Sequence, residues 1–167
     1  MVKYVTTEIT FCEVPDKICR TFSISNCGGS CPGCHSPYLR DDNGHELTED
    51  ILFSFFEKDK MYVDCYVFLG EGNDIEGIKR LFGACKTAGF DVCLYTGKPI
   101  FDINNGFFGI LDYLKVGPFI EELGGLDKKT TNQKFYHVIY NDKGYELIDM
   151  TWKFLPENSR VLSKIYV

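Results

Sequence analysis

The chain has 167 residues, of which 44% are hydrophobic and 15% aromatic. This length fits a single domain over residues 1–167 and excludes a complete eight-unit (β/α) barrel, which needs about 250 residues. The 24 acidic and 18 basic side chains give a net charge of −6. An acidic chain without a basic run argues against nucleic acid or an anionic membrane as a partner.

The beginning of the chain and its apolar runs bear on cellular location. Residues 1–11 lack the basic segment followed by an apolar stretch that marks a secretory signal. No apolar run approaches the roughly 20 residues of a membrane span, so we expect no membrane association. We therefore expect a cytoplasmic protein, in which thiols stay reduced and clustered cysteines indicate metal ligation or catalysis.

The first half of the chain is expected to alternate strands and helices. Residues 20–25 alternate polar and apolar side chains, which is typical of a strand. Thr48 is placed to cap a helix with an apolar face. Residues 62–69, dense in Val, Tyr and Phe, predict a second strand. A second helix should follow a cap at Asn73 or Asp74 and end at Gly89.

The second half begins with two more predicted strands, at residues 90–95 and 111–115, separated by an irregular piece near residues 101–109. Residues 135–140 and 145–150, joined by Asn-Asp-Lys-Gly, predict an antiparallel hairpin. Together these elements predict an α/β fold. We expect a partial (β/α) barrel of five to six mainly parallel strands with a C-terminal antiparallel hairpin.

Three of the eight cysteines are clustered in Cys27-Gly-Gly-Ser-Cys31-Pro-Gly-Cys34-His35, directly after the first predicted strand. Glycine lets the backbone reverse tightly, so three thiolates in this stretch can surround one metal centre. The position also fits, because ligand sites of parallel α/β folds lie at the carboxyl ends of the strands. The remaining cysteines are expected to be small buried packing residues: Cys12, Cys19, Cys65, Cys85 and Cys93.

Several interpretations of the cluster remain open on spacing alone. His35 could complete a Cys3His zinc site. Cys12 or Cys65 could supply the fourth ligand of an ordinary iron–sulfur cluster. Unliganded core or redox thiols are a third possibility, and a cluster held by three protein ligands with one open iron is the fourth.

The Cys-x3-Cys-x2-Cys spacing resembles the signature of the radical S-adenosylmethionine (SAM) superfamily. The Cys-Pro-Gly-Cys variant resembles the activating proteins of anaerobic ribonucleotide reductases. So do the segment Asp-Tyr-Leu-Lys-Val-Gly-Pro-Phe (residues 112–119) and Thr-Asn-Gln-Lys-Phe-Tyr (residues 131–136), in which Lys134 replaces a usual Arg. The likeness spans roughly residues 15–140. One departure is Gly33, where many members of the superfamily have an aromatic residue.

The resemblance implies a fold of the radical SAM type and an enzyme, a glycyl-radical-enzyme activase. Cys27, Cys31 and Cys34 would hold a 4Fe–4S cluster whose open iron binds SAM. Reduced flavodoxin or ferredoxin would supply an electron, and SAM would be cleaved to methionine and a 5′-deoxyadenosyl radical. That radical would take a hydrogen atom from a glycine of the partner, the anaerobic ribonucleoside-triphosphate reductase.

The resemblance also implies a set of SAM-binding positions. Gly70, Glu71 and Gly72 form a permuted version of the family's Gly-Gly-Glu turn, where glycine allows close approach to a ligand. Thr96 follows the third strand in a Tyr-Thr-Gly turn and could donate to SAM. Asp112 and Lys115 are expected to flank the end of the fourth strand, and Lys115 could pair with the SAM carboxylate. No residue beyond the cluster ligands is assigned a catalytic role.

Overall fold

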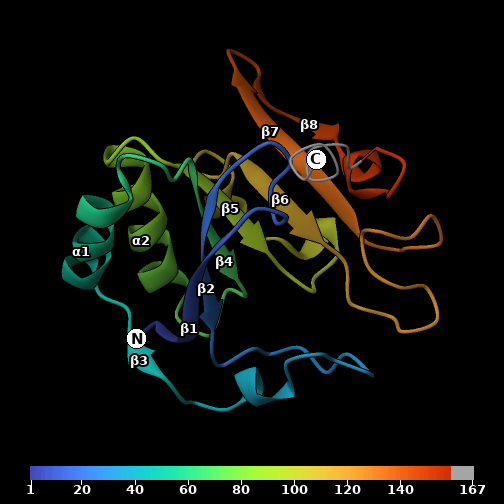
Figure 1. Cartoon of the computed structure of the whole chain (residues 1–167), viewed down its shortest axis with the longest axis horizontal. Coiled ribbons are helices and arrows are strands. Elements are labelled where there is room, and N and C mark those ends of the chain that lie inside the picture. Colours follow the sequence, from blue (N-terminus) through green and yellow to red (C-terminus); the bar gives the residue numbers. More distant parts are fainter. Residues whose placement is uncertain (159–167) are drawn as a thin grey trace, which may run out of the picture.

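The computed structural model describes residues 1–158. It contains two α-helices and one mixed sheet (Figure 1). The strands are β1 (Lys3–Thr10), β2 (Cys19–Ile24), β3 (His45–Glu46), β4 (Cys65–Leu69), β5 (Asp91–Tyr95), β6 (Tyr113–Val116), β7 (Lys134–Asn141) and β8 (Gly144–Asp149). The helices are α1 (Glu49–Asp59) and α2 (Ile75–Thr87), and the four short 3-10 helices are Pro37–Arg40, Ile100–Asp102, Asn105–Phe107 and Thr151–Phe154.

Within residues 1–158 the sheet has eight strands in the order β3-β1-β2-β4-β5-β6-β7-β8, and no further strand pairs with either outer strand. The central strands β2, β4, β5 and β6 are parallel neighbours, whereas the four outer pairings are antiparallel. The expectation of five to six mainly parallel strands is therefore wrong in number and in balance. The α/β class is confirmed, as is the C-terminal hairpin of β7 and β8.

The difference in strand number comes from the N-terminal segment. β1 pairs with β2 on one side and with the two-residue β3 on the other. Along β1 the side chains are mostly half-buried, so the segment lacks the alternation of buried and exposed side chains that predicts a strand from sequence. Tertiary pairing rather than local pattern makes this segment extended.

Both helices begin where side-chain caps were predicted. The Thr48 hydroxyl accepts a hydrogen bond from the Ile51 N–H at 3.3 Å, and an Asp74 carboxylate oxygen accepts one from the Gly77 N–H at 2.8 Å. These contacts satisfy backbone donors that have no partner inside the helix. The irregular piece near residues 101–109 is confirmed as two 3-10 turns.

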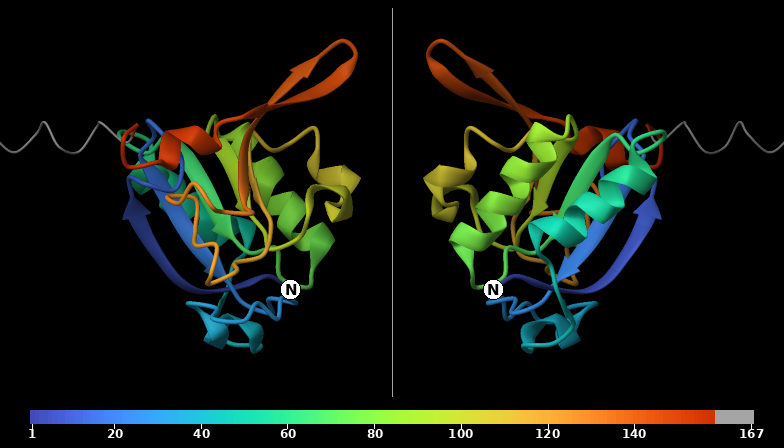
Figure 2. Two further views of the ribbon diagram at one scale, coloured as in Figure 1. Left: turned by 90° about the vertical axis from the view of Figure 1, so that its right-hand side faces the viewer. Right: turned by 90° about the vertical axis from the view of Figure 1, so that its left-hand side faces the viewer.

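The two helices cover one face of the sheet (Figure 2). The larger apolar core lies between these helices and the sheet. It includes Phe22, Phe68, Phe82 and Leu94, all fully buried. A smaller cluster around Cys93 and Phe135 lies on the opposite face. Among residues 1–158, no helix is long and apolar enough to cross a membrane.

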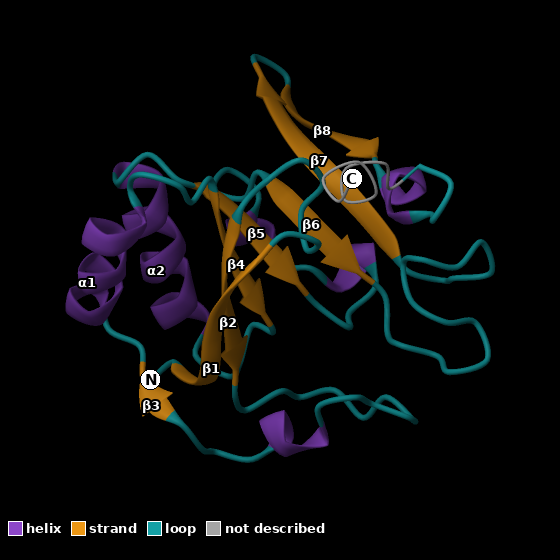
Figure 3. Cartoon of the chain, viewed as in Figure 1, coloured by secondary structure: helices purple, strands orange, loops and turns teal. Residues whose placement is uncertain are grey.

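The arrowheads of the four parallel strands point toward the same end of the sheet (Figure 3). Two long connections leave from that end: residues 25–44, after β2, and residues 117–133, after β6. The β7–β8 hairpin projects from the opposite end of the sheet (Figure 1), because β7 runs antiparallel to β6. The carboxyl ends of the parallel strands, where ligands bind in such sheets, are therefore bordered by loops rather than by helices.

Candidate functional site

Buried polar side chains gather at the carboxyl ends of the parallel strands. Ser25 follows β2, Glu71 follows β4, Thr96 follows β5 and Lys115 lies near the end of β6. All four are buried, with exposed fractions between 1% and 8%. Polar groups are rarely placed in an interior unless they are paired or used, so this row is the strongest candidate site in the described part of the chain.

The turn after β4 fixes the position of Glu71. Gly70 and Gly72 have φ angles of +109° and +62°, in the region that favours glycine. A Cβ on Gly72 would lie 3.2 Å from both Ile24 Cγ2 and the Ser25 carbonyl oxygen. The turn therefore packs closely on the end of β2. Of the three residues predicted in this turn, Gly70 and Gly72 set the backbone conformation, and Glu71 supplies a carboxylate to the site.

The Glu71 carboxylate is only half satisfied. Its Oε1 accepts a hydrogen bond from the Thr96 hydroxyl at 3.3 Å and forms an ion pair with Lys98 Nζ at 2.8 Å. Its Oε2 is buried and accepts no hydrogen bond from any residue in the range 1–158. A buried carboxylate oxygen without a donor is costly, so Oε2 is a candidate acceptor for a donor group of a ligand.

Lys115 lies in the same row. Its Nζ donates to the Gly117 carbonyl at 2.9 Å, and the Gln133 amide donates to that carbonyl at 3.4 Å. Burial lowers the pKa of Lys115 to about 8, although the Cys31 thiol opposes this effect. Within residues 1–158 this ammonium has no carboxylate partner, so it is suited to an anionic group of a ligand.

The cysteine loop lies against this row. Cys31 Sγ is 3.8 Å from the point that a Cβ on Gly97 would occupy, in the turn after β5. Cys27 Sγ and Cys31 Sγ both approach Gly29, at 3.4 and 3.9 Å from its Cβ position. Cys34 Sγ accepts a hydrogen bond from the Ser36 N–H at 3.4 Å. All three thiols are free, and none is buried.

The donor set fits a soft metal centre, because three free thiols within one loop are the ligands that iron–sulfur clusters use. Backbone N–H donation to sulfur, as at Cys34, is one of the contacts by which proteins tune such clusters. Within residues 1–158, no group of three or more His, Cys, Asp or Glu side chains is assembled for a metal ion. Cys27 and Cys31 place their thiols near Gly29, whereas the Cys34 thiol contacts the backbone of Ser36.

A cavity of about 330 Å³ adjoins the row and the loop. Its lining includes Tyr95 and Lys115 from the strands, and Cys12, His35 and Gln133 from the loops. The His35 ring packs against Phe119 with centroids 4.6 Å apart. His35 is therefore a packing residue between the two long connections that border the cavity.

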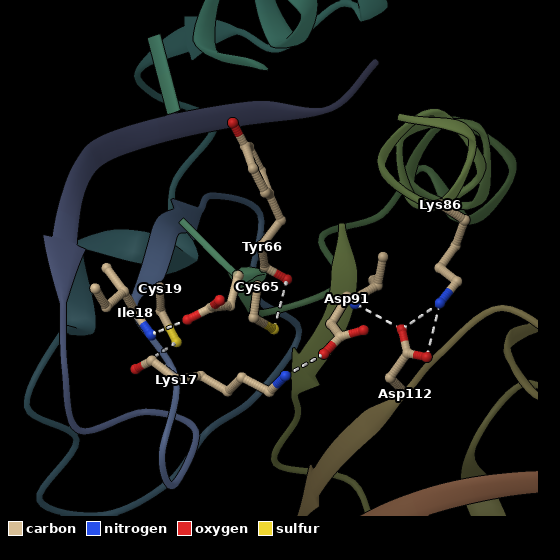
Figure 4. Close-up of polar contacts among 10 residues, drawn as sticks. Lys17, Ile18, Cys19, Cys65, Tyr66, Lys86, Asp91 and Asp112 are labelled. Carbon is tan, nitrogen blue, oxygen red and sulfur yellow. Dashed lines mark hydrogen bonds and ion pairs between the residues drawn. The ribbon is translucent and has the colours of Figure 1, made fainter. Parts of the chain in front are cut away.

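Two predicted placements need correction. Asp112 lies at the start of β6, at the opposite end of the sheet from Lys115. There it accepts two hydrogen bonds from Lys86 at 2.7 Å and one from the Val92 N–H at 2.8 Å (Figure 4). Its carboxylate ties α2 to the sheet, outside the site.

The second correction concerns the scattered cysteines. Cys19, Cys65, Cys85 and Cys93 are buried as expected, but Cys12 is exposed. Cys19 and Cys65 occupy paired positions at the start of β2 and β4, where their thiols face main-chain carbonyls (Figure 4). Burial raises the pKa of Cys65, Cys85 and Cys93, which keeps these thiols neutral.

Sequence reasoning missed Ser25 and Lys98 as members of the site. Ser25 Oγ is buried and has no hydrogen-bond partner among residues 1–158. Lys98 directly follows the Tyr-Thr-Gly turn after β5, and this position at a strand end was the available signal. Neither a scan of protein-family models nor a search of curated proteins finds a match to this chain.

Proposed function

We propose that the chain is a radical SAM enzyme that activates an anaerobic ribonucleoside-triphosphate reductase by forming a glycyl radical on it. The observation that carries the proposal is the junction of two features. A three-cysteine loop follows β2, and a row of buried, incompletely paired polar groups lies at the carboxyl ends of the same parallel strands.

The arrangement of the strands supports the finer fold assignment. β2, β4, β5 and β6 are parallel neighbours and succeed one another across the sheet in the direction of the chain, an order that partial (β/α) barrels share with open parallel sheets. The antiparallel pairs at either side leave the sheet open. We propose that this open side admits a loop of the partner protein to the cavity.

The proposed roles follow the chemistry of each group. Cys27, Cys31 and Cys34 would hold the 4Fe–4S cluster as thiolates. Glu71 has a free acceptor oxygen for the ammonium group of SAM, and Lys115 has a buried ammonium without a carboxylate partner for the SAM carboxylate. When bound, the cluster supplies the electron, received from flavodoxin or ferredoxin, that starts the reductive cleavage of SAM.

The protein's own contribution is orientation and exclusion of water. Glu71 and Lys115 carry opposite charges and lie at the ends of strands that are two positions apart in the sheet order. A ligand with both an ammonium and a carboxylate group could contact both. Thr96 donates its hydroxyl to Glu71 and thereby helps to hold the carboxylate in place.

The test is anaerobic reconstitution with iron and sulfide, followed by dithionite and SAM, with 5′-deoxyadenosine and methionine measured. We expect SAM cleavage by the wild-type protein and none by Cys31→Ala. Cys85→Ala is the matched control, because Cys85 is buried on the helix side of the sheet and should not be needed. Absence of cleavage with an intact cluster would contradict the proposal, as would stoichiometric zinc in protein purified without oxygen.

The narrower part of the proposal concerns the partner. Adding the cognate reductase to the reduced, SAM-loaded protein should produce a glycyl-radical signal in electron paramagnetic resonance. SAM cleavage without that signal would leave the protein a radical SAM enzyme and would overturn its assignment as an activase.

A further inference from the structure

Lys98 and Glu71 form an ion pair that joins the protein surface to the buried site. The Glu71 side chain is 9% exposed, whereas the Lys98 side chain is 49% exposed. Lys98 Nζ reaches the carboxylate from the solvent side at 2.8 Å. Among residues 1–158 this is the cation that pairs with Glu71, so a half-exposed lysine neutralises a buried acid.

The two side chains of this ion pair differ in whether they can leave it. The Lys98 ammonium can return to water, because about half of its side chain is already exposed. Glu71 cannot do so, since its position is set by the turn between Gly70 and Gly72 and by the Thr96 hydroxyl. Glu71 therefore stays in the site, while the cation beside it is replaceable.

A second cation bound to Glu71 would be repelled by the positive charge of Lys98. The unpartnered Oε2 belongs to the same carboxylate as Oε1, which already bears the lysine. Two ammonium groups on one carboxylate repel each other, and the repulsion is larger where burial excludes water. A cationic ligand group at Oε2 would thus weaken the contact with Lys98 or displace it.

We infer that Lys98 is an internal competitor for the ligand ammonium. It neutralises Glu71 when the site is empty and gives way when the ammonium group of SAM arrives. The inference rests on the proposed function, because that function supplies the ligand. Lys98 would then set the affinity of the site and hold the carboxylate in place between turnovers.

The test is the affinity of the anaerobically reconstituted protein for SAM, measured by equilibrium dialysis. Lys98→Met keeps the length and apolar stem of the side chain but removes the charge. We expect it to bind SAM about two- to fivefold more tightly, because the ligand ammonium no longer has to displace a lysine from Glu71. Lys98→Arg keeps the charge and should bind SAM like the wild type.

Three controls separate competition from other effects. Lys60→Met removes the same charge from another exposed pair, Lys60–Glu57 at 2.7 Å, which lies on α1. It should leave SAM affinity unchanged. Methylthioadenosine, which lacks the ammonium and carboxylate groups, should bind wild type and Lys98→Met equally. In a Glu71→Gln background, Lys98→Met should have no further effect on SAM affinity.

The outcomes distinguish the two claims. If the wild type does not bind SAM, the proposed function fails and the competition fails with it. If the wild type binds SAM but Lys98→Met binds it equally well or more weakly, the proposed function stands and the competition is wrong. Tighter SAM binding by Lys60→Met would also overturn the competition, since it would reveal a general effect of net charge.

Discussion

Arg20 and Asp59 form a two-point ion pair that joins the start of β2 to the end of α1. Arg20 Nε donates to Asp59 Oδ2 at 2.8 Å, and Nη2 donates to Oδ1 at 2.6 Å. The hydroxyls of Tyr66 and Tyr62 donate to the same carboxylate. Asp59 is fully buried, so its charge depends entirely on these four donors.

We expect Asp59→Asn to lower the free energy of unfolding by about 3–5 kcal/mol, because it removes one partner of a buried ion pair and leaves a guanidinium without its counter-charge. Urea unfolding followed by circular dichroism measures the change. Glu57→Gln is the control, since the Glu57–Lys60 pair is exposed and should contribute less than about 1 kcal/mol. Equal effects of the two substitutions would contradict the assigned role of Asp59.

Asp59 also predicts how stability depends on pH. Burial by itself raises the pKa of Asp59, but hydrogen bonds from Arg20 and Tyr66 outweigh burial and hold the pKa below its ordinary value of 3.8. A carboxyl whose pKa is lower in the folded state stabilises the protein above the unfolded pKa, and this stabilisation is lost as the pH falls through the folded pKa.

The free energy of unfolding should therefore fall more steeply in the wild type than in Asp59→Asn as the pH is lowered from roughly 5 toward 2. Urea unfolding at a series of pH values gives both curves. Parallel curves for the two proteins would show that Asp59 has the same pKa in the folded and unfolded states.

The turn after β4 gives a prediction with an internal control. Gly72→Ala should destabilise the fold by about 1–2 kcal/mol, because alanine disfavours a positive φ and its Cβ would press on Ile24 and Ser25. Gly83→Ala, in the interior of α2, places a Cβ with no neighbour within 4 Å and should stabilise by about 0.5–1 kcal/mol. Thermal unfolding of both variants checks the opposite signs.

The cysteines should divide into two groups by their reactivity with Ellman's reagent under native conditions. Cys12, Cys27, Cys31 and Cys34 are at least partly accessible and should react, Cys12 more slowly because burial and the neighbouring Glu13 raise its pKa. Buried thiols should react only after unfolding, and these are Cys19, Cys65, Cys85 and Cys93. Reconstitution with iron and sulfide should protect three of the reactive thiols. Protection of none would count against the proposed ligands.

Much of the fold could be predicted because its core elements have strong local patterns. The cap residues Thr48 and Asp74, and the dense apolar runs of β4 and β5, located the helices and the parallel strands close to their observed positions. β1 and β3 were missed, since a half-buried strand and a two-residue strand form by pairing with neighbours. Pairing between distant segments leaves little trace in local sequence.

The candidate site was predicted unevenly for a similar reason. Gly70, Glu71, Thr96 and Lys115 all follow or end a parallel strand, so topology alone brings them to one edge of the sheet. Lys98 was missed because a surface lysine looks the same in a sequence whether or not it reaches a buried acid. Asp112 was expected at the end of the strand that became β6, but it lies before that strand, at the other end of the sheet.

The C-terminal hairpin places β8 at one edge of the sheet. β8 pairs with β7 on one side, and no strand within residues 1–158 pairs with its other side. The outer backbone groups of β8 can therefore hydrogen-bond to an extended chain. Glu146 adds a negative charge to this strand, whereas Asp149 is paired with Lys134 at 3.0 Å. An added strand with a lysine or arginine opposite Glu146 is therefore favoured over one with an acidic side chain there.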